Sequence, residues 1–307
     1  MRRYLAIRLV QSLVTILLVL FVVFALARLA GDPVTLLVDF EASQDDIDQI
    51  KENLGLNDPL PVQFVRFLGD AVQGDFGTSF RTSRPAMDEV LSRVPASAQL
   101  AGFSLLISLA ISIPLGVLAA VTRGSIIDVI ARFFALIGQA APNFWVGLML
   151  IFLFAVRFGW FPTGGRGGLD HMILPAITLG TSASASLTRL TRSSMLEVIN
   201  SDFVTMARAK GLPRRVVIFK HALRNALIPI VTILGVRVGV LISGSVIVET
   251  IFAWPGVGRL IIQAINVSDF PVVQAAVLLT ATTIIAANFL TDIAYIVIDP
   301  RIRYVRS

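Results

Sequence analysis

The sequence predicts an all-α polytopic membrane protein with six transmembrane helices. Of its 307 residues, 55% are hydrophobic and 15% are charged, whereas soluble domains carry about 25% charged residues. The apolar residues gather in long runs, and the basic residues gather in the loops on one side of those runs. The chain has no cysteine, which excludes disulfides and thiolate metal sites, and we expect no metal to be bound.

Six runs approach the length of about 20 apolar residues that a helix needs to cross a bilayer. The first is longer than the core of a secretory signal, so we interpret residues 1–30 as an uncleaved first helix. Residues 31–96 form an insert, and residues 97–307 contain the other five helices. The predicted spans are about Leu9–Leu29, Ser97–Val121, Phe133–Val156, Met172–Leu190, Ala226–Val248 and Val272–Ile298.

The distribution of charge predicts the orientation of the chain. With both termini in the cytoplasm (N-in, C-in), most of the 26 basic residues fall in cytoplasmic segments, as the positive-inside rule requires. The insert at 31–96 is then extracytoplasmic, and it is more acidic than basic. The basic residues are thus the usual signature of a membrane protein, and we expect no nucleic acid to bind.

The insert is expected to contain two helices. The stretch ASQDDIDQIKENLGL has a possible N-cap at Ser43 and a helix-ending Gly55. The stretch VQFVRFLGDAVQGDFGTSF follows, with Phe64, Phe67 and Leu68 on one side. We interpret the insert as a small cap on the helix ends; direct contact with a soluble partner is compatible with this.

Two further patterns concern the shape and packing of the spans. Pro142 removes a backbone donor from the third span and is expected to kink it. In the fourth span, Gly180 with Ser184, and Ser182 with Ser186, have the small-xxx-small spacing that allows helices to approach closely.

A short basic segment, SDFVTMARAKG, separates the fourth and fifth spans and faces the cytoplasm in this topology. Ser201 is suited to begin a helix there, and Gly211 to end it in the left-handed conformation. Phe203, Met206 and Ala207 are predicted to share a face. From spacing alone the helix either lies on anionic lipid or inserts Phe203 and Met206 into a groove on a cytoplasmic protein.

The motifs resemble the permease subunits of ABC importers, in the dipeptide, oligopeptide and nickel branch that includes glutathione transporters. ARAKGL followed by HALRNALIP is similar to the cytoplasmic coupling loop of that family. The family pattern has Glu and Ala where this chain has Thr205 and Met206, while Ala207 and Gly211 fit it. The other matching motifs, in the family's order, are GDP after the first span, GDFGTS at 74–79, ILPAITL at 173–179, VETIFAWPGVGRL at 248–260 and DPRIR at 299–303.

This resemblance implies a type I importer permease fold in the bacterial cytoplasmic (inner) membrane. A second permease, usually non-identical, would complete the pore, and an extracytoplasmic binding protein would deliver a short peptide, with nickel or another small solute as the alternative. Two cytoplasmic ATPases, which would bind the ATP and Mg²⁺, would dock on a coupling loop at about 197–225. The implied coupling residues are Asp202, Phe203, Thr205, Met206, Ala207, Arg208, Ala209, Lys210 and Gly211.

The chain itself is not expected to be an enzyme. It contains no G-x-x-x-x-G-K-[ST] sequence, so it has no phosphate-binding loop of that type. An intramembrane protease is excluded because His171 and His221 lie at or outside the span ends, leaving no base for a nucleophile. The energy then comes from a partner or from an ion gradient, so an ion-coupled secondary transporter remains the alternative.

Charged and polar residues within the spans are candidates for the translocation pathway. Arg237 either forms a structural pair with Asp292, or extends its side chain toward the membrane surface, or lines the pore as a cation that meets a substrate carboxylate. The amide side chains either line the pore or bond between helices. After the fifth span, WPGVGRLIIQAI predicts a short helix; Trp254 is a gate candidate by resemblance or an interfacial anchor. The full set is Gln139, Asn143, Arg237, Trp254, Pro255, Gly256, Asn288 and Asp292.

Overall fold

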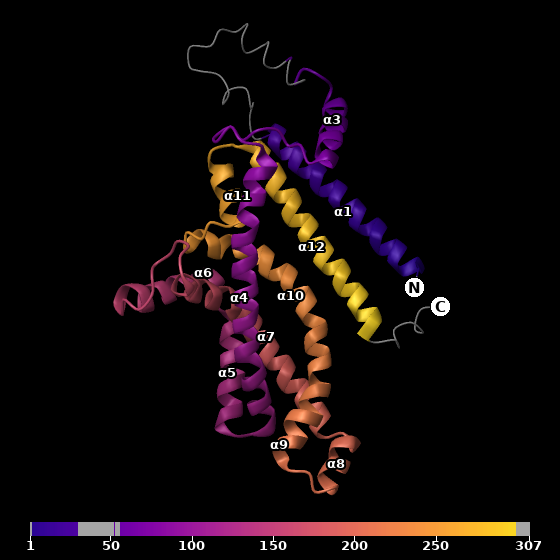
Figure 1. The fold of residues 1–307 in the computed structure, drawn as a ribbon, viewed down its shortest axis with the longest axis vertical. Coiled ribbons are helices and arrows are strands. Elements are labelled where there is room, and N and C mark those ends of the chain that lie inside the picture. The colour runs from indigo at the N-terminus through magenta and orange to yellow at the C-terminus, as the bar shows by residue number, and fades with distance from the viewer. Residues whose placement is uncertain (1, 30–51, 53–55, 299–307) are drawn as a thin grey trace. The chain divides into compact units, whose positions relative to one another are not determined.

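The structure is a computed structural model that describes residues 2–29, 52 and 56–298, except the side chains of residues 2–5, 232, 235–244, 292 and 294–298 (Figure 1). Its regular elements in these ranges are helices, and Thr78 forms an isolated antiparallel bridge with Pro85. Apart from residue 52, the helix predicted between Ser43 and Gly55 lies outside the described residues. The elements are α1 (Arg2–Leu29), α3 (Leu60–Gln73), α4 (Ala86–Val121), α5 (Ile126–Ala140), α6 (Asn143–Leu150), the π-helix η2 (Ile151–Arg157), α7 (Leu169–Ile199), α8 (Asp202–Ala209), α9 (Arg214–Val216), the π-helix η3 (Val217–Ala222), α10 (Leu223–Ile251), α11 (Val257–Asn266) and α12 (Phe270–Ile298).

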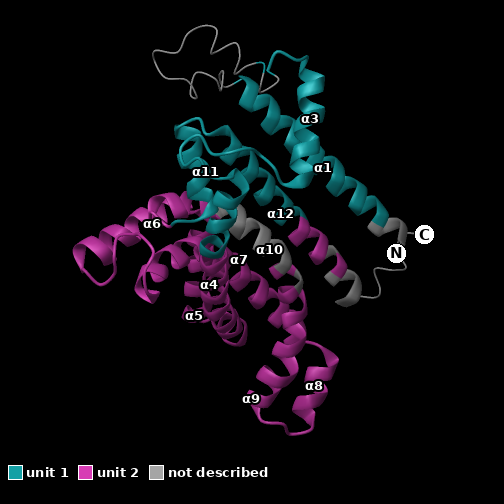
Figure 2. Cartoon of the chain, turned by 45° about the horizontal axis from the view of Figure 1, so that its top comes forward, with its two compact units in different colours: residues 1–97, 255–285 teal, residues 98–254, 286–307 magenta. Residues whose placement is uncertain are grey.

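The chain divides into two compact units (Figure 2). Unit 1 comprises residues 1–97 and 255–285, and unit 2 comprises residues 98–254 and 286–307. Two of the three boundaries fall inside α4 and α12, so each of these helices contributes to both units, and the third lies between Trp254 and Pro255, in the connection from α10 to α11.

Unit 1 is built on α1, α3, α11 and the first turns of α4 and α12. The predicted amphipathic helix in the insert is confirmed as α3, and its Phe64 packs on Phe21 of α1 with ring centroids 5.6 Å apart. Phe67 packs on Phe24 at 5.6 Å and on Phe76 at 6.1 Å. These rings adjoin a buried cluster to which all five elements contribute: Leu20, Ala71, Phe76, Ala86, Val90, Val257, Leu260, Ala264, Val272, Ala275 and Ala276.

Unit 2 is held together by close helix packing around α7. The predicted close approach at Gly180 is confirmed: the Ser108 hydroxyl of α4 donates to the Gly180 carbonyl at 3.0 Å. A Cβ atom at Gly180 would lie 2.8 Å from that same hydroxyl oxygen. Gly116 of α4 is equally restricted, because a Cβ there would lie 2.5 Å from Cβ of Thr191. Glycine at these two positions lets α4 and α7 approach more closely than larger residues allow.

This packing yields a first prediction. Gly116→Ala is expected to destabilise the protein by about 1–3 kcal/mol, because the added methyl group overpacks the α4–α7 contact. Gly102→Ala in the same helix is the matched control, since a Cβ there meets nothing within 4 Å. Thermal unfolding of both variants in detergent measures the difference, and equal stability of the two would show that the contact tolerates a methyl group.

The prediction of one continuous helix over residues 133–156 is wrong. The helix ends at Ala140 and resumes at Asn143, and α5 is bent by 108° from the segment Asn143–Arg157. The physical cause is Pro142, which lacks an N–H and disfavours a helical conformation in the residue before it. Ala141 and Pro142 both have extended backbone angles, so the chain leaves the helix altogether instead of kinking within it.

By length and composition, three described helical segments are suited to cross a membrane: Ala6–Leu29, Ala86–Val121 and Phe270–Thr291. The bent pair Ile126–Ala140 and Asn143–Arg157 makes a fourth if it counts as one broken span. The predicted fourth span lies within α7, which is rich in hydroxyl side chains. Four of these side chains donate to carbonyls one turn earlier and so are satisfied within the helix: Thr178, Thr181, Ser186 and Thr188.

Candidate functional site

The short helix predicted between the fourth and fifth spans is present as α8, Asp202–Ala209. Ser201 precedes it with extended backbone angles, but its hydroxyl donates back to the Val198 carbonyl at 2.6 Å and does not cap the helix. Ser201 thus stands at the predicted start of the helix, although its side chain makes no capping bond. The predicted left-handed end is confirmed: Gly211 has φ +76°, and its N–H donates to the Arg208 carbonyl at 2.9 Å.

The inner face of α8 is formed by Val204 and Ala207, which are 0% and 7% exposed. They belong to a cluster drawn from four other elements: Val117 and Ala120 of α4, Met195 of α7, Val217 and Ala222 of η3, and Ala226 of α10. The prediction that Ala207 shares a face with Phe203 and Met206 is wrong, because Ala207 points into this cluster. Val204 was missed, although its spacing of three residues from Ala207 marks the buried stripe.

The outer face of α8 carries Phe203 and Met206, which are 45% and 61% exposed. Two large apolar side chains one turn apart thus project from a helix whose opposite side is buried in its own chain. Thr205, between them in sequence, donates to the Ser201 carbonyl at 3.2 Å. The other predicted coupling residues are exposed around this pair: Asp202, Thr205, Arg208, Ala209, Lys210 and Gly211.

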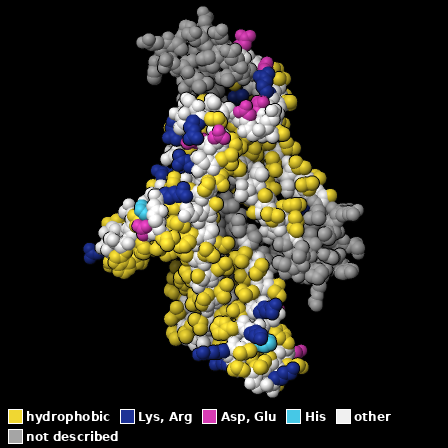
Figure 3. Space-filling model, in the orientation of Figure 1, with side chains coloured by type: hydrophobic (Ala, Val, Ile, Leu, Met, Phe, Trp, Pro, Cys, Tyr) yellow, Lys and Arg dark blue, Asp and Glu magenta, His cyan; other side chains and the backbone are white. Residues whose placement is uncertain are grey.

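Basic side chains surround the apolar pair. Lys and Arg gather at the end of unit 2 that carries α8 and α9, while hydrophobic side chains cover the visible face of α5 (Figure 3). Arg208 and Arg214 line a cleft of about 300 Å³ together with apolar residues that include Ile199 and Leu212. The surface therefore combines two apolar projections with a positively charged rim.

A buried ion pair fastens α5 to α7. Asp128 is 1% exposed, and its two carboxylate oxygens accept from Nε and an NH2 group of Arg192 at 2.6 and 3.0 Å. The Gly124 N–H donates to the same carboxylate at 3.0 Å, and Arg132 lies 3.5 Å from it. Sequence reasoning missed this pair, because 64 residues separate its partners and neither stands in a recognisable motif.

Gln139, one of the predicted pathway residues, bonds between helices. Its amide nitrogen donates to the Ser186 hydroxyl at 3.0 Å, and its amide oxygen accepts from Arg189 at 2.7 Å. Both partners belong to α7, so Gln139 joins α5 to α7. This geometry matches the interhelical alternative for the amide residues.

The other pathway candidates occupy different environments. Trp254 is fully buried, and the guanidinium carbon of Arg166 lies 5.9 Å from its ring centroid. Asn143 begins α6 and is half-buried, while Asn288 is exposed on α12. The predicted short helix after Trp254 is confirmed as α11. Pro255 is half-buried, Gly256 precedes α11, and the side chains of Arg237 and Asp292 lie outside the described part.

Comparison with known proteins covers almost the whole chain. A family model described as "Binding-protein-dependent transport system inner membrane component" matches residues 112–304, and its N-terminal companion model matches residues 1–101. The oligopeptide transport system permease protein AppB of Bacillus subtilis is 44% identical over 316 residues, covering 99% of this chain and all of the relative.

Two further relatives are similar over comparable lengths. The dipeptide transport system permease protein DppB of Alkalihalophilus pseudofirmus is 39% identical and covers 89% of this chain and 91% of its own. The glutathione transport system permease protein GsiC of Escherichia coli K12 is also 39% identical, covering 99% of this chain and all of the relative.

Proposed function

Because the chain belongs to the binding-protein-dependent transport system inner membrane components, we propose that it forms half of the pore of an ABC importer and that α8 couples this pore to ATPases. Members of this family are permease subunits of the inner membrane and not enzymes. ATP hydrolysis would therefore take place on separate cytoplasmic subunits, which would hold the nucleotide and Mg²⁺.

This proposal rests on the difference between the exposed outer face and the buried inner face of α8. Phe203 and Met206 are large, exposed and adjacent on the outer face, which suits anchors that fill a pocket on a partner. Val204 and Ala207 are embedded among side chains of α4, α7, η3 and α10. Since packed interiors resist compression, a push on the outer face would move α8 together with the helices around it.

The topology proposed for this function has six transmembrane helices with both termini in the cytoplasm. It places α8 with its basic rim in the cytoplasm, in agreement with the positive-inside rule. Residues 1–30 would contain the first helix, residues 31–96 the extracytoplasmic insert, and residues 97–307 the permease core. A second permease, two ATPases and a binding protein would complete the importer.

The proposed cargo is a short peptide, glutathione included. The names of the similar permeases, which refer to oligopeptide, dipeptide and glutathione transport, support this choice. Import of nickel or another small solute by the same machinery is the alternative. Since the binding protein would select the cargo, its ligand would decide between these substrates.

Affinity purification from gently solubilised native membranes, followed by mass spectrometry, tests the proposed assembly. We expect a second permease and ABC ATPases to co-purify, and deletion of residues 201–211 to remove the ATPases alone. Purification of the subunit by itself, in membranes that transport normally, would contradict the proposal and favour an ion-coupled transporter.

A prediction about Gly211 follows from its left-handed conformation. Gly211→Val places a β-branched residue at φ +76°, at a cost of about 1–3 kcal/mol, so the turn after α8 is expected to shift and transport to fall. Gly211→Asn is the matched control, because asparagine tolerates this conformation. Peptide uptake into vesicles, normalised to the membrane content of the subunit, measures both; equal uptake would show that the turn is not required.

A further inference from the structure

The cleft of about 300 Å³ that Arg208 and Arg214 line lies where helices of unit 2 end or begin. Ala120 and Val121 are the last residues of α4, and Ile199 is the last residue of α7. The rest of the lining is Leu212, Val217 and Ile218. No carboxylate is among these eight residues, so the cleft combines two guanidinium groups with an apolar wall.

The turn at Gly211 brings the two arginines to one cleft. Arg208 belongs to the last turn of α8, and Arg214 is the first residue of α9. An NH2 group of Arg208 donates to the Ile199 carbonyl at 3.5 Å, which uses one of the five N–H donors of the guanidinium group. Within the described residues, the side chain of Arg214 has no hydrogen bond or ion pair. The cleft therefore retains donors and positive charge for an anionic ligand.

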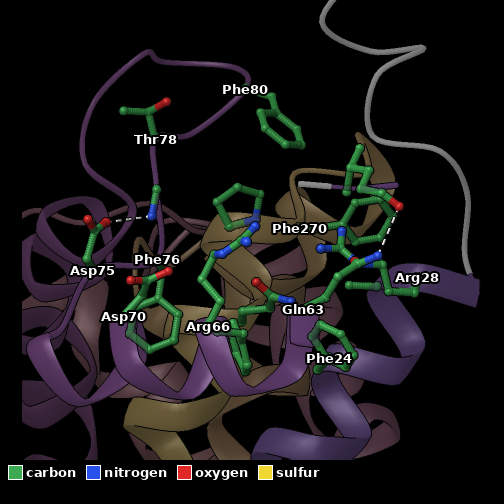
Figure 4. A pocket seen from close by; sticks show the side chains of 16 residues that line it. Phe24, Arg28, Gln63, Arg66, Asp70, Asp75, Phe76, Thr78, Phe80 and Phe270 are labelled. Atoms are coloured by element: carbon green, nitrogen blue, oxygen red, sulfur yellow. Dashed lines mark hydrogen bonds between the residues drawn. The ribbon is translucent and has the colours of Figure 1, made fainter. Parts of the chain in front are cut away.

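A larger pocket, of about 400 Å³, lies within unit 1 and differs in this respect (Figure 4). Both of its arginines have partners. Arg66 is paired with Asp58 at 2.8 Å, and the guanidinium carbon of Arg28 lies 5.3 Å from the ring centroid of Phe24. Of these two cavities, the cleft of unit 2 is therefore the one with a guanidinium group that lacks a counter-charge.

The cleft lies away from the proposed ATPase anchors. With 3.6 residues per turn, Arg208 is roughly 140° around α8 from Phe203 and roughly 160° from Met206. Val121 ends both α4 and the second predicted span. In the proposed topology the cleft thus lies where the hydrocarbon core ends on the cytoplasmic side, at the level of the lipid headgroups.

We propose that this cleft binds the headgroup of an anionic phospholipid from the cytoplasmic leaflet. Its phosphate would accept from Arg208 and Arg214, because guanidinium groups present paired N–H donors to phosphate oxygens. The adjoining part of the acyl chains would lie against the apolar wall. Basic pockets between helices on the cytoplasmic side of a membrane suit such headgroups.

A phosphate held by both arginines would link α8 to α9 across the Gly211 turn. The lipid would thereby stiffen the segment through which coupling is proposed. The inference rests on the proposed function, which places the cleft on the cytoplasmic side of the membrane, where anionic lipids give the leaflet its negative surface potential.

Native mass spectrometry of the assembled importer, delipidated in neutral detergent and titrated with dioleoyl phosphatidylglycerol, tests the inference. We expect saturable binding to the wild type. In Arg214→Gln one site should bind about tenfold more weakly, because a charge-assisted hydrogen bond is lost. Arg214→Lys retains the charge and should bind more tightly than Arg214→Gln.

Two controls make the test specific. Arg215→Gln removes the same charge from the next residue, which is also exposed but does not line the cleft, and it should bind phosphatidylglycerol as the wild type does. Dioleoyl phosphatidylcholine has the same acyl chains and no net charge. It should bind weakly and be insensitive to Arg214→Gln.

Four results would overturn the inference. The first two are no saturable binding of phosphatidylglycerol to the wild type, and equal effects of Arg214→Gln and Arg215→Gln. The third is binding of inorganic phosphate as tight as that of the lipid, which would assign the cleft to a free anion. The fourth is weaker ATPase binding by Arg214→Gln in nanodiscs of phosphatidylcholine alone, which would assign the cleft to a carboxylate of the ATPase.

Binding of the ATPases to the wild-type permease pair is measured in parallel, in nanodiscs with and without phosphatidylglycerol. Normal ATPase binding together with a cleft that binds no lipid contradicts this inference only. Failure of the ATPases to bind in either lipid contradicts the proposed function.

Discussion

Replacing Asp128 with alanine is expected to destabilise the protein by about 3 kcal/mol, near the lower end of the range for removing one partner of a buried ion pair. The carboxylate is buried and binds Arg192 through both oxygens. Its loss leaves the guanidinium without its counter-charge between α5 and α7. We choose the lower end because the Arg192 side chain is 21% exposed and water can partly solvate it.

Two comparisons make this prediction specific. Asp58→Ala breaks the exposed pair between Asp58 and Arg66, whose side chains are 40% and 53% exposed, and is expected to cost no more than about 1 kcal/mol. The double variant Asp128→Leu/Arg192→Met removes both charges and should be more stable than Asp128→Ala. Thermal unfolding in detergent ranks the stabilities of the two single variants and the double variant. If Asp128→Ala is as stable as Asp58→Ala, the ion pair of Asp128 and Arg192 does not hold α5 to α7.

Truncating the outer face of α8, by Phe203→Ala together with Met206→Ala, is expected to release the ATPases. Anchor residues of this kind contribute about 2 kcal/mol or more each, and 2 kcal/mol corresponds to an affinity on the order of 30-fold weaker. The fold should be preserved, because both side chains are exposed. Binding of purified ATPase subunits to the permease pair in nanodiscs measures the loss.

Two controls separate docking from folding. Val65→Ala removes an apolar side chain that is 68% exposed on α3, and it should leave ATPase binding unchanged. Val204→Ala removes a fully buried side chain from the inner face of α8 and should lower stability first. If the double variant binds ATPases as tightly as Val65→Ala does, the outer face of α8 is not the docking surface.

The sequence predicted those structural features that are determined by residues close together in the chain. The left-handed end of α8 at Gly211 and the amphipathic character of α3 follow from residue types within one or two turns. The break at Pro142 was predicted in position but not in size, because a proline removes a hydrogen bond locally while the 108° angle depends on the packing of both flanking helices.

Features that join distant parts of the chain could not be predicted in this way. The pair of Asp128 and Arg192 bridges α5 and α7, and its two partners are 64 residues apart in the sequence. The inward position of Ala207 is an intermediate case. Its spacing from Val204 was visible, but the cluster that selects this pair over Phe203 and Met206 comes from four other elements.

Site-specific crosslinking tests the central claim most directly, and the absence of native cysteine makes single-cysteine variants simple to interpret. Met206→Cys, labelled with a photoreactive maleimide in the reconstituted importer, is expected to crosslink to an ATPase subunit. Val65→Cys should not do so, because the proposed topology places it on the opposite side of the membrane. An ATPase crosslink from residue 65, or none from residue 206 in an importer that still transports peptide, would contradict the assignment of α8 as the coupling helix.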